Sequence, residues 1–243
     1  MHKTSNYSPN FDAKKRSAND IRFLIFHYTG MKNEIDAINR LTSPKSKVSS
    51  HYFIKNNGEI LILVPDLFVA WHAGISKWEN FKFLNKNSIG IEISNPGHEN
   101  GYKKFNKKQI NSILKLSKIL IKKYKIKSKF ILGHSDISPD RKKDPGEKFP
   151  WKFLAKKNIG HWHNLEDKNL LSARNKKITK FDKKIFINNL YKIGYLNNLN
   201  VKKHNNLKLV IKAFQRRYRQ RLINGLIDCE CLLISKDLLK KFK

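Results

Sequence analysis

The sequence has 243 residues, a length that does not favour a repeat array or a fibre, and its 40% of hydrophobic residues exclude a disordered or collagen-like chain. Its 51 Lys and Arg against 19 Asp and Glu give a net charge of +32, which would attract a polyanion. The lysines are spread over the whole chain, without a tight arginine cluster and interleaved aromatics, so charge alone does not assign a function.

Cysteine content and hydropathy also limit the class of protein. Cys229 and Cys231 are too close in sequence for an unstrained disulfide, and they lack the partners of a zinc finger. The N-terminus is polar and has no signal-peptide pattern, and no run of about 18 apolar residues predicts a transmembrane segment. We therefore expect a cytoplasmic protein, with the periplasm or cell envelope as the alternative.

The first half of the chain begins with strand and helix patterns in alternation. The apolar run 21–28 predicts a buried strand that carries His27 at its carboxyl end. Residues 34–41 have helical spacing. The segments 51–54 and 59–64 flank an Asn-Asn-Gly turn and predict a β-hairpin.

The pattern continues with a strand over 88–93, which carries Glu92 near its end. Residues 106–124 have the spacing of an amphipathic helix, and 130–132 predict a short strand that leads to His134. Strands mixed with helices predict an α/β domain, with a mixed central β-sheet flanked by helices, over residues 1–163.

The composition changes after this domain. Residues 164–177 are polar and lysine-rich without a clear period, and we predict a linker over 164–180. Helical patterns at 183–191, 207–218 and 235–242 predict a small helical domain over 181–243.

Two histidines and one carboxylate could form a catalytic site. His27 and His134 follow predicted buried strands, at the edge where open α/β sheets place their sites. Asp144 lies in the polar, turn-rich loop after His134. Two imidazole nitrogens and one carboxylate are typical of catalytic zinc, with a fourth position left for water. From the residues alone, this zinc site is a hypothesis.

Six ordered strings between residues 20 and 160 carry a resemblance to a known family: FHYT (26–29), SSHY (49–52), AWHAGIS (70–76), SIGIE (88–92), GHSDISPDRKKDPG (133–146) and FPW (149–151). They resemble zinc-dependent N-acetylmuramoyl-L-alanine amidases of the AmpD and AmiD type, relatives of phage amidase lysozymes and peptidoglycan recognition proteins. The string at 133–146 is the most specific. The resemblance implies the type 2 amidase fold.

The C-terminal region carries a second resemblance. The string AFQRRY (213–218), followed by Asn224-Gly225 and Asp228, looks like the helical peptidoglycan-binding domain after the amidase in the AmiD-like branch. Alternatively, Phe214 and Tyr218, spaced i and i+4, only contribute to a helical core.

Carried over residue by residue, the resemblance implies that His27, His134 and Asp144 bind Zn²⁺ and that Glu92 and Lys142 are the catalytic pair. Zinc lowers the pKa of bound water to about 7. Glu92 can take the proton of that water and return it to the leaving nitrogen. The Lys142 ammonium can face the developing oxyanion.

The same strings suggest substrate contacts. Trp71, His72 and Asn95 match family positions and are predicted to bind substrate, although each could instead brace a loop.

For other polar residues we favour structural roles. His51 is predicted to be structural, and His161 and His163 lie past the last family string and are not assigned to a metal. Asp136 is predicted to cap its loop rather than bind zinc.

We therefore predict a zinc hydrolase that cleaves the amide between N-acetylmuramic acid, or its 1,6-anhydro form, and L-alanine in peptidoglycan or muropeptides, during cell wall turnover or recycling. A non-catalytic peptidoglycan-binding protein is the alternative, but all five metal and catalytic positions are filled. A nucleic-acid-binding protein would need a localised basic face, and we expect no specific nucleic-acid partner. By analogy with the family, we expect a monomer.

Overall fold

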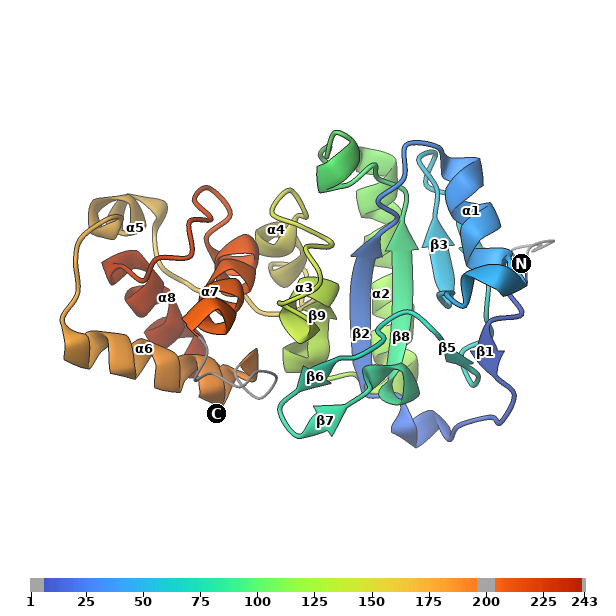
Figure 1. Ribbon diagram of the computed structural model, residues 1–243, viewed down its shortest axis with the longest axis horizontal. Coiled ribbons are helices and arrows are strands. Elements are labelled where there is room, and N and C mark those ends of the chain that lie inside the picture. Colours follow the sequence, from blue (N-terminus) through green and yellow to red (C-terminus); the bar gives the residue numbers. More distant parts are fainter. Residues whose placement is uncertain (1–6, 196–203, 242–243) are drawn as a thin grey trace.

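The computed structural model describes residues 7–195 and 204–241. They form an α/β part, residues 7–163, and an adjoining helical part, residues 181–195 and 204–241 (Figure 1). The strands are β1 (Phe11–Asp12), β2 (Phe23–Tyr28), β3 (Tyr52–Ile54), β4 (Ile60–Ile62), β5 (Val69–Ala70), β6 (Lys77–Trp78), β7 (Phe81–Lys82), β8 (Ser88–Ile93) and β9 (Ile131–Gly133). The helices are α1 (Glu34–Thr42), α2 (Lys107–Tyr124), α3 (His134–Ile137), α4 (Trp151–Ala155), α5 (Asp167–Ala173), α6 (Lys180–Ile193), α7 (His204–Tyr218) and α8 (Cys229–Leu239).

The central sheet has five strands in the order β4-β3-β8-β2-β9. Neighbours from β3 to β9 are parallel, whereas β4 pairs with β3 as the predicted antiparallel hairpin. The predicted fold class, a mixed sheet flanked by helices, is therefore confirmed. His27 of β2 lies opposite Glu92 of β8, and Phe26 lies opposite Gly133 of β9. This register brings three strand ends together at one edge of the sheet.

Alternating side chains of the sheet contact different helices on its two faces. Phe53 of β3 belongs to a cluster with Ala37 and Leu41 of α1. Its neighbour Ile54 belongs to the main core, which includes Ile113 of α2. The period of two along a strand thus places β3 between α1 and α2.

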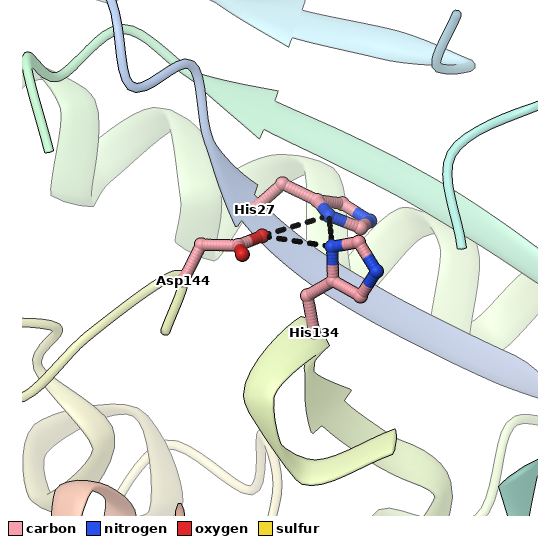
Figure 2. Close-up of side chains that lie close together, drawn as sticks. All are labelled: His27, His134 and Asp144. Atoms are coloured by element: carbon pink, nitrogen blue, oxygen red, sulfur yellow. Dashed lines mark hydrogen bonds and ion pairs between the residues drawn. The ribbon is translucent and has the colours of Figure 1, made fainter. Parts of the chain in front are cut away.

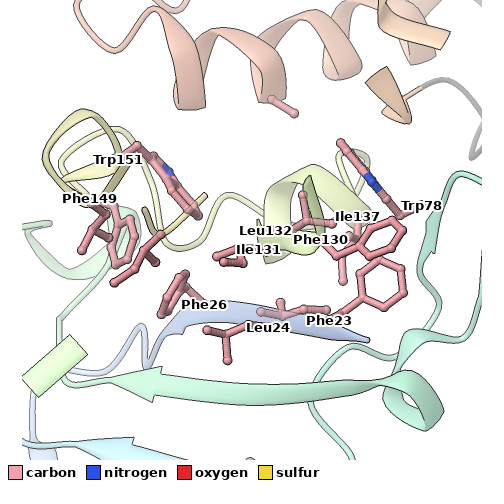
Figure 3. Close-up of a cluster of buried hydrophobic side chains, with 14 of the residues drawn as sticks. Phe23, Leu24, Phe26, Trp78, Phe130, Ile131, Leu132, Ile137, Phe149 and Trp151 are labelled. Carbon is pink, nitrogen blue, oxygen red and sulfur yellow. The ribbon is translucent and has the colours of Figure 1, made fainter. Parts of the chain in front are cut away.

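Aromatic residues fill the core between β2 and the segments that follow β9 (Figure 3). The ring centroid of Phe26 lies 5.0 Å from that of Phe149 and 5.7 Å from that of Trp151 in α4. Phe23, at the other end of β2, lies 4.6 Å from Phe130. These contacts fix the chain on both sides of the β9–α3 turn.

The helical part contains the three predicted helices with different bounds. α6 begins at Lys180 rather than at the predicted 183, directly after the capping residue Thr179. α8 begins at Cys229 rather than 235, because the Asp228 side chain accepts a hydrogen bond from the Cys231 N–H and caps the helix. The predicted end of this helix at Phe242 lies outside the described residues.

The segment predicted as a linker contains a packed helix. In α5, Leu170 and Ala173 are buried. Arg174, which follows α5, donates two hydrogen bonds of 2.6 Å to Glu230 of α8. Residues 164–180 are therefore not an unstructured connection, and the division into an amidase domain, a linker and a helical domain stays a prediction.

The hydropathy of the helices bears on whether the chain could cross a membrane. Within residues 7–195 and 204–241, none of the helices has the length and apolar character that a membrane crossing requires.

Replacing Asn106 by Ala should lower the free energy of unfolding by about 1 kcal/mol. Asn106 accepts a hydrogen bond from the Gln109 N–H at the start of α2, and Gln109 accepts one from the Asn106 N–H. Urea denaturation measures the change. Asn111→Ala, on the exposed side of the same helix, is the control and should have no destabilising effect. Equal losses in the two variants would contradict the capping role.

Candidate metal centre

Three buried side chains converge at the edge of the sheet where β2 and β9 end (Figure 2). His27 lies near the end of β2, His134 begins α3 directly after β9, and Asp144 lies in the following loop. The two Nδ1 atoms lie 3.0 Å apart, and they lie 3.0 and 3.1 Å from Asp144 Oδ2. Among the described residues, this is the only group of His, Cys, Asp or Glu side chains with the spacing of a metal site.

Hydrogen bonds on the far side of each ring fix its tautomer. His134 Nε2 must donate to the Ala73 carbonyl oxygen, 3.1 Å away, because that oxygen can only accept. In the neutral ring, Nδ1 of His134 then carries a lone pair. Ring orientation by such contacts is usual for metal-ligating histidines.

The tautomer of His27 is fixed by a relay of three hydrogen bonds. The Ser88 hydroxyl donates to the Leu84 carbonyl oxygen at 2.6 Å, so Ser88 Oγ accepts from His72 Nε2 at 3.1 Å. His72 Nδ1 therefore accepts from His27 Nε2 at 3.0 Å. His27 Nδ1 is left without a proton and faces the other two members of the cluster.

As a consequence of these hydrogen bonds, lone pairs of the three donor atoms face one another. The two Nδ1 atoms and the Asp144 carboxylate all present lone pairs to one another at about hydrogen-bond distance, with no proton assigned between them. Such an arrangement requires a cation or a captured proton at its centre. His27, His134 and Asp144 can therefore hold a metal ion.

Burial favours the neutral form of His27 and His72. Burial, together with the nearby His134 ring, lowers the pKa of His27 to about 4. Burial and the His27 ring also lower the pKa of His72. Neutral imidazole is the form that binds a metal.

Glu92 and Lys142 lie beside the cluster in one cavity of about 390 Å³. Glu92 Oε2 is buried and has no hydrogen-bond partner among the described residues. Burial, reinforced by the Asp144 charge, raises the pKa of Glu92 to about 8, against the opposing charge of Lys142. A carboxylate with a raised pKa at the edge of a cavity is suited to proton transfer.

The residues predicted to bind substrate are placed differently from one another. Trp71 and His72 line the cavity. The Trp71 indole N–H donates to Asp12, and both ring nitrogens of His72 belong to the relay. Asn95 is buried within its own loop, where it donates to the Lys103 carbonyl oxygen at 2.9 Å and accepts from the Gly97 N–H at 3.1 Å. Substrate binding by Asn95 would require a change of partners.

The residues predicted to be structural have structural contacts. His51 accepts a hydrogen bond from the Gly90 N–H at 3.0 Å, and Asp136 accepts one from the Gly133 N–H at 2.8 Å, as expected of a cap. His161 and His163 line a separate pocket away from the cluster.

Sequence reasoning missed the roles of Ser88 and Gly90 on β8. A Cβ atom at Gly90 would lie 2.4 Å from the His72 ring, so the ring requires glycine beneath it. A glycine inside a predicted strand is the signal that indicates such a close approach.

Most of the chain is similar to known proteins. The family model for N-acetylmuramoyl-L-alanine amidase, Amidase_2, matches residues 17–147. The chain is 36% identical over 237 residues to N-acetylmuramoyl-L-alanine amidase AmiD of Escherichia coli strain K12, covering 91% of this chain and 83% of the relative. It is 34% identical to 1,6-anhydro-N-acetylmuramyl-L-alanine amidase AmpD of Haemophilus influenzae, covering 59% of this chain and 85% of the relative.

Two solved structures share the fold over both parts of the chain. One is E. coli AmiD in complex with anhydro-N-acetylmuramic acid-L-Ala-D-gamma-Glu-L-Lys, with a TM-score of 0.79, 33% identity, and coverage of 95% of this chain and 91% of the other. The other is AmpDh3 of Pseudomonas aeruginosa in complex with anhydromuramic pentapeptide, with a TM-score of 0.81, 28% identity, and coverage of 96% and 97%.

Replacing Ser88 by Ala should weaken metal binding by about tenfold. The change removes the acceptor for His72 Nε2 and releases the tautomer of His27. Metal affinity is measured by competition with a chromophoric chelator. Ser117→Ala is the matched control, because Ser117 is also buried but its hydroxyl has no partner among the described residues. Equal affinities in the two variants would show that the relay does not orient His27.

The metal-free protein should lose stability as the pH falls from about 6.5 to about 4. Burial lowers the pKa of His27 to about 4 and that of His51 to about 3, whereas unfolded histidine titrates near 6.5. The unfolded chain therefore binds protons that the folded chain excludes. Glu92, with its raised pKa, opposes this effect but is a single group.

Urea denaturation with chelator at pH 7 and pH 5 measures the loss. Each histidine contributes at most about 1.4 kcal/mol per pH unit, so His51→Gln should reduce the pH dependence by up to that amount. A free energy of unfolding that is equal at the two pH values would contradict the neutral burial of these rings.

Proposed function

The chain belongs to the N-acetylmuramoyl-L-alanine amidase family, and we propose that it is a zinc-dependent enzyme that hydrolyses the amide between N-acetylmuramic acid, or its 1,6-anhydro form, and L-alanine. The observation that carries this proposal is the convergence of His27, His134 and Asp144 at a cavity that is also lined by Glu92. Catalysis rather than binding alone is favoured because all five metal and catalytic positions are filled.

Zinc fits the donor set better than a hard cation does. Two neutral imidazoles and one carboxylate are a usual zinc set, whereas magnesium and calcium prefer oxygen ligands. Donors about 2.0 to 2.1 Å from a tetrahedral ion lie about 3.3 Å apart. This spacing is close to the 3.0 and 3.1 Å between the three donor atoms.

When bound here, zinc would supply a Lewis acid and lower the pKa of a coordinated water to about 7. Glu92 is proposed to take the proton of the attacking water on its buried carboxylate and deliver it to the leaving amide nitrogen. Its pKa of about 8 without metal would be reduced by the nearby cation, which favours the basic form before attack.

Lys142 is proposed to stabilise the negative charge that develops on the carbonyl oxygen. The residue is half-buried in the cavity wall, and its side chain has no hydrogen bond or ion pair with the described residues. An ammonium that is not neutralised by a partner can interact with charge formed during the reaction.

The charge of the cavity also suits a stem peptide, which carries carboxylates. Arg40, Arg141 and Lys142 line the cavity, and Lys143 is paired with Glu99 at 2.9 Å. We propose that these cations attract the acidic peptide, and that Trp71 contacts the substrate.

We also propose a monomer, because one chain contributes all five residues. The helical part, residues 181–243, is proposed to be a peptidoglycan-binding-like domain. Phe214 and Tyr218 in its resembling string are both buried, so a wall contact would have to use other residues.

Mass spectrometry of purified anhydro-muropeptide and intact sacculi, each incubated with zinc-loaded protein, tests the proposed function. Free stem peptide should be released, and chelator or Asp144→Ala should abolish its release. Glu92→Gln should retain zinc but reduce kcat by about 10²- to 10⁴-fold. Asp140→Ala, an exposed carboxylate in the same loop, is the control and should retain activity.

Preference for soluble anhydro-muropeptide would support a cytoplasmic recycling role, and preference for sacculi would support the cell envelope. Failure of the zinc-loaded protein to release peptide from either substrate would contradict catalysis and favour the non-catalytic wall-binding alternative.

A further inference from the structure

A buried arginine of the helical part contacts three elements of the α/β part. Arg217 of α7 is 2% exposed. Its Nη1 lies 2.5 Å from Asp136 Oδ2 in α3, and its Nη2 donates to the Ile131 carbonyl oxygen of β9 at 2.9 Å. The guanidinium also stacks over the Trp151 ring of α4, 4.2 Å from its centroid. One side chain thus connects the helical part to β9, α3 and α4.

Asp136 is completely enclosed by its partners. It is 1% exposed, and its Oδ1 accepts a hydrogen bond of 2.6 Å from the Tyr195 hydroxyl, which follows α6. Its Oδ2 accepts from Arg217 and from the Gly133 N–H. A buried carboxylate keeps its place only when its charge and lone pairs are matched, and the helical part supplies both Arg217 and Tyr195.

The same carboxylate fixes the turn that carries the candidate metal ligands. α3 consists of only four residues, begins at His134, and is capped by Asp136 through the Gly133 N–H. The Ser135 N–H donates to the Asp144 carbonyl oxygen at 2.8 Å, so the position of α3 also determines that of Asp144. A shift of Asp136 would therefore displace two of the three donors.

We propose that the helical part is a component of the active site, in which Arg217 and Tyr195 act as positioning residues for His134 and Asp144 through Asp136. This inference rests on the proposed function insofar as it takes His134 and Asp144 as zinc ligands. It goes further because it makes zinc affinity and turnover depend on residues of α7 and the end of α6, whether or not this part binds peptidoglycan.

The test compares Arg217→Leu with Arg219→Leu in the full-length chain. Arg219 is a matched control, since it is equally buried and ion-paired, with Asp228. Its hydrogen bonds and ion pairs among the described residues all lie within the helical part. Zinc affinity is measured by chelator competition. The constants kcat and KM are measured with anhydro-muropeptide as substrate, and thermal unfolding is measured on the metal-free proteins.

Arg217→Leu should raise the zinc Kd by about tenfold or more and lower kcat, with KM nearly unchanged. Arg219→Leu should lower the Tm without changing the zinc Kd. Arg217→Lys should restore part of the zinc affinity, because lysine keeps the charge but cannot contact Asp136 and Ile131 together as the planar guanidinium does.

A zinc Kd for Arg217→Leu equal to that of Arg219→Leu would overturn the inference and leave the proposed function intact. A wild-type protein that binds no zinc would overturn both. If Arg217→Leu does not fold, Tyr195→Phe decides, since it removes only one hydroxyl: a Kd raised by about threefold supports the positioning role, and an unchanged Kd overturns it.

Discussion

The parallel register of β2 with β8 and β9 is the constraint on which the site depends. Hydrogen bonds between these strands place His27 opposite Glu92 and Phe26 opposite Gly133, the last residue of β9. His134, the first residue of α3, follows directly. A shift of one residue would turn His27 to the other face of the sheet. Because β2 is buried on both faces, its apolar residues hold the register, and the core thereby determines the chemistry at the strand ends.

Around this register, the hydrogen-bond network removes protons from the centre of the site. Backbone carbonyl oxygens can only accept. The Leu84 carbonyl acts through Ser88 and His72 on His27, whereas the Ala73 carbonyl accepts directly from His134, and in both rings the inward nitrogen is left with a lone pair. Burial acts in the same direction by disfavouring imidazolium. The site is thus prepared for a cation by elements that do not touch it, and low solvent exposure strengthens the effect of every fixed charge.

Much of this arrangement can be predicted from the sequence, and the misses have physical reasons. The predicted strand at 88–93 and the predicted helix at 106–124 both have clear periods, and the helix also has the capping residue Asn106; the structure agrees with both within one residue. β1, β5, β6 and β7 have two residues each, too few to show a period. The early start of α8 was missed because the buried Glu230, matched by Arg174, interrupts the apolar pattern. The relay through His72 joins residues 45 and 16 positions apart, a distance that no local pattern records.

The packed segment between the two parts has a consequence for how the protein can meet a polymer. Two modules joined by a flexible linker can adopt many separations, so the second module can reach contact points at many distances from the first. With α5 held against α8 and Arg217 anchored in the α/β part, a single separation is available. Binding of one polymer by both parts would therefore gain avidity only where the two contact points on the polymer match that separation.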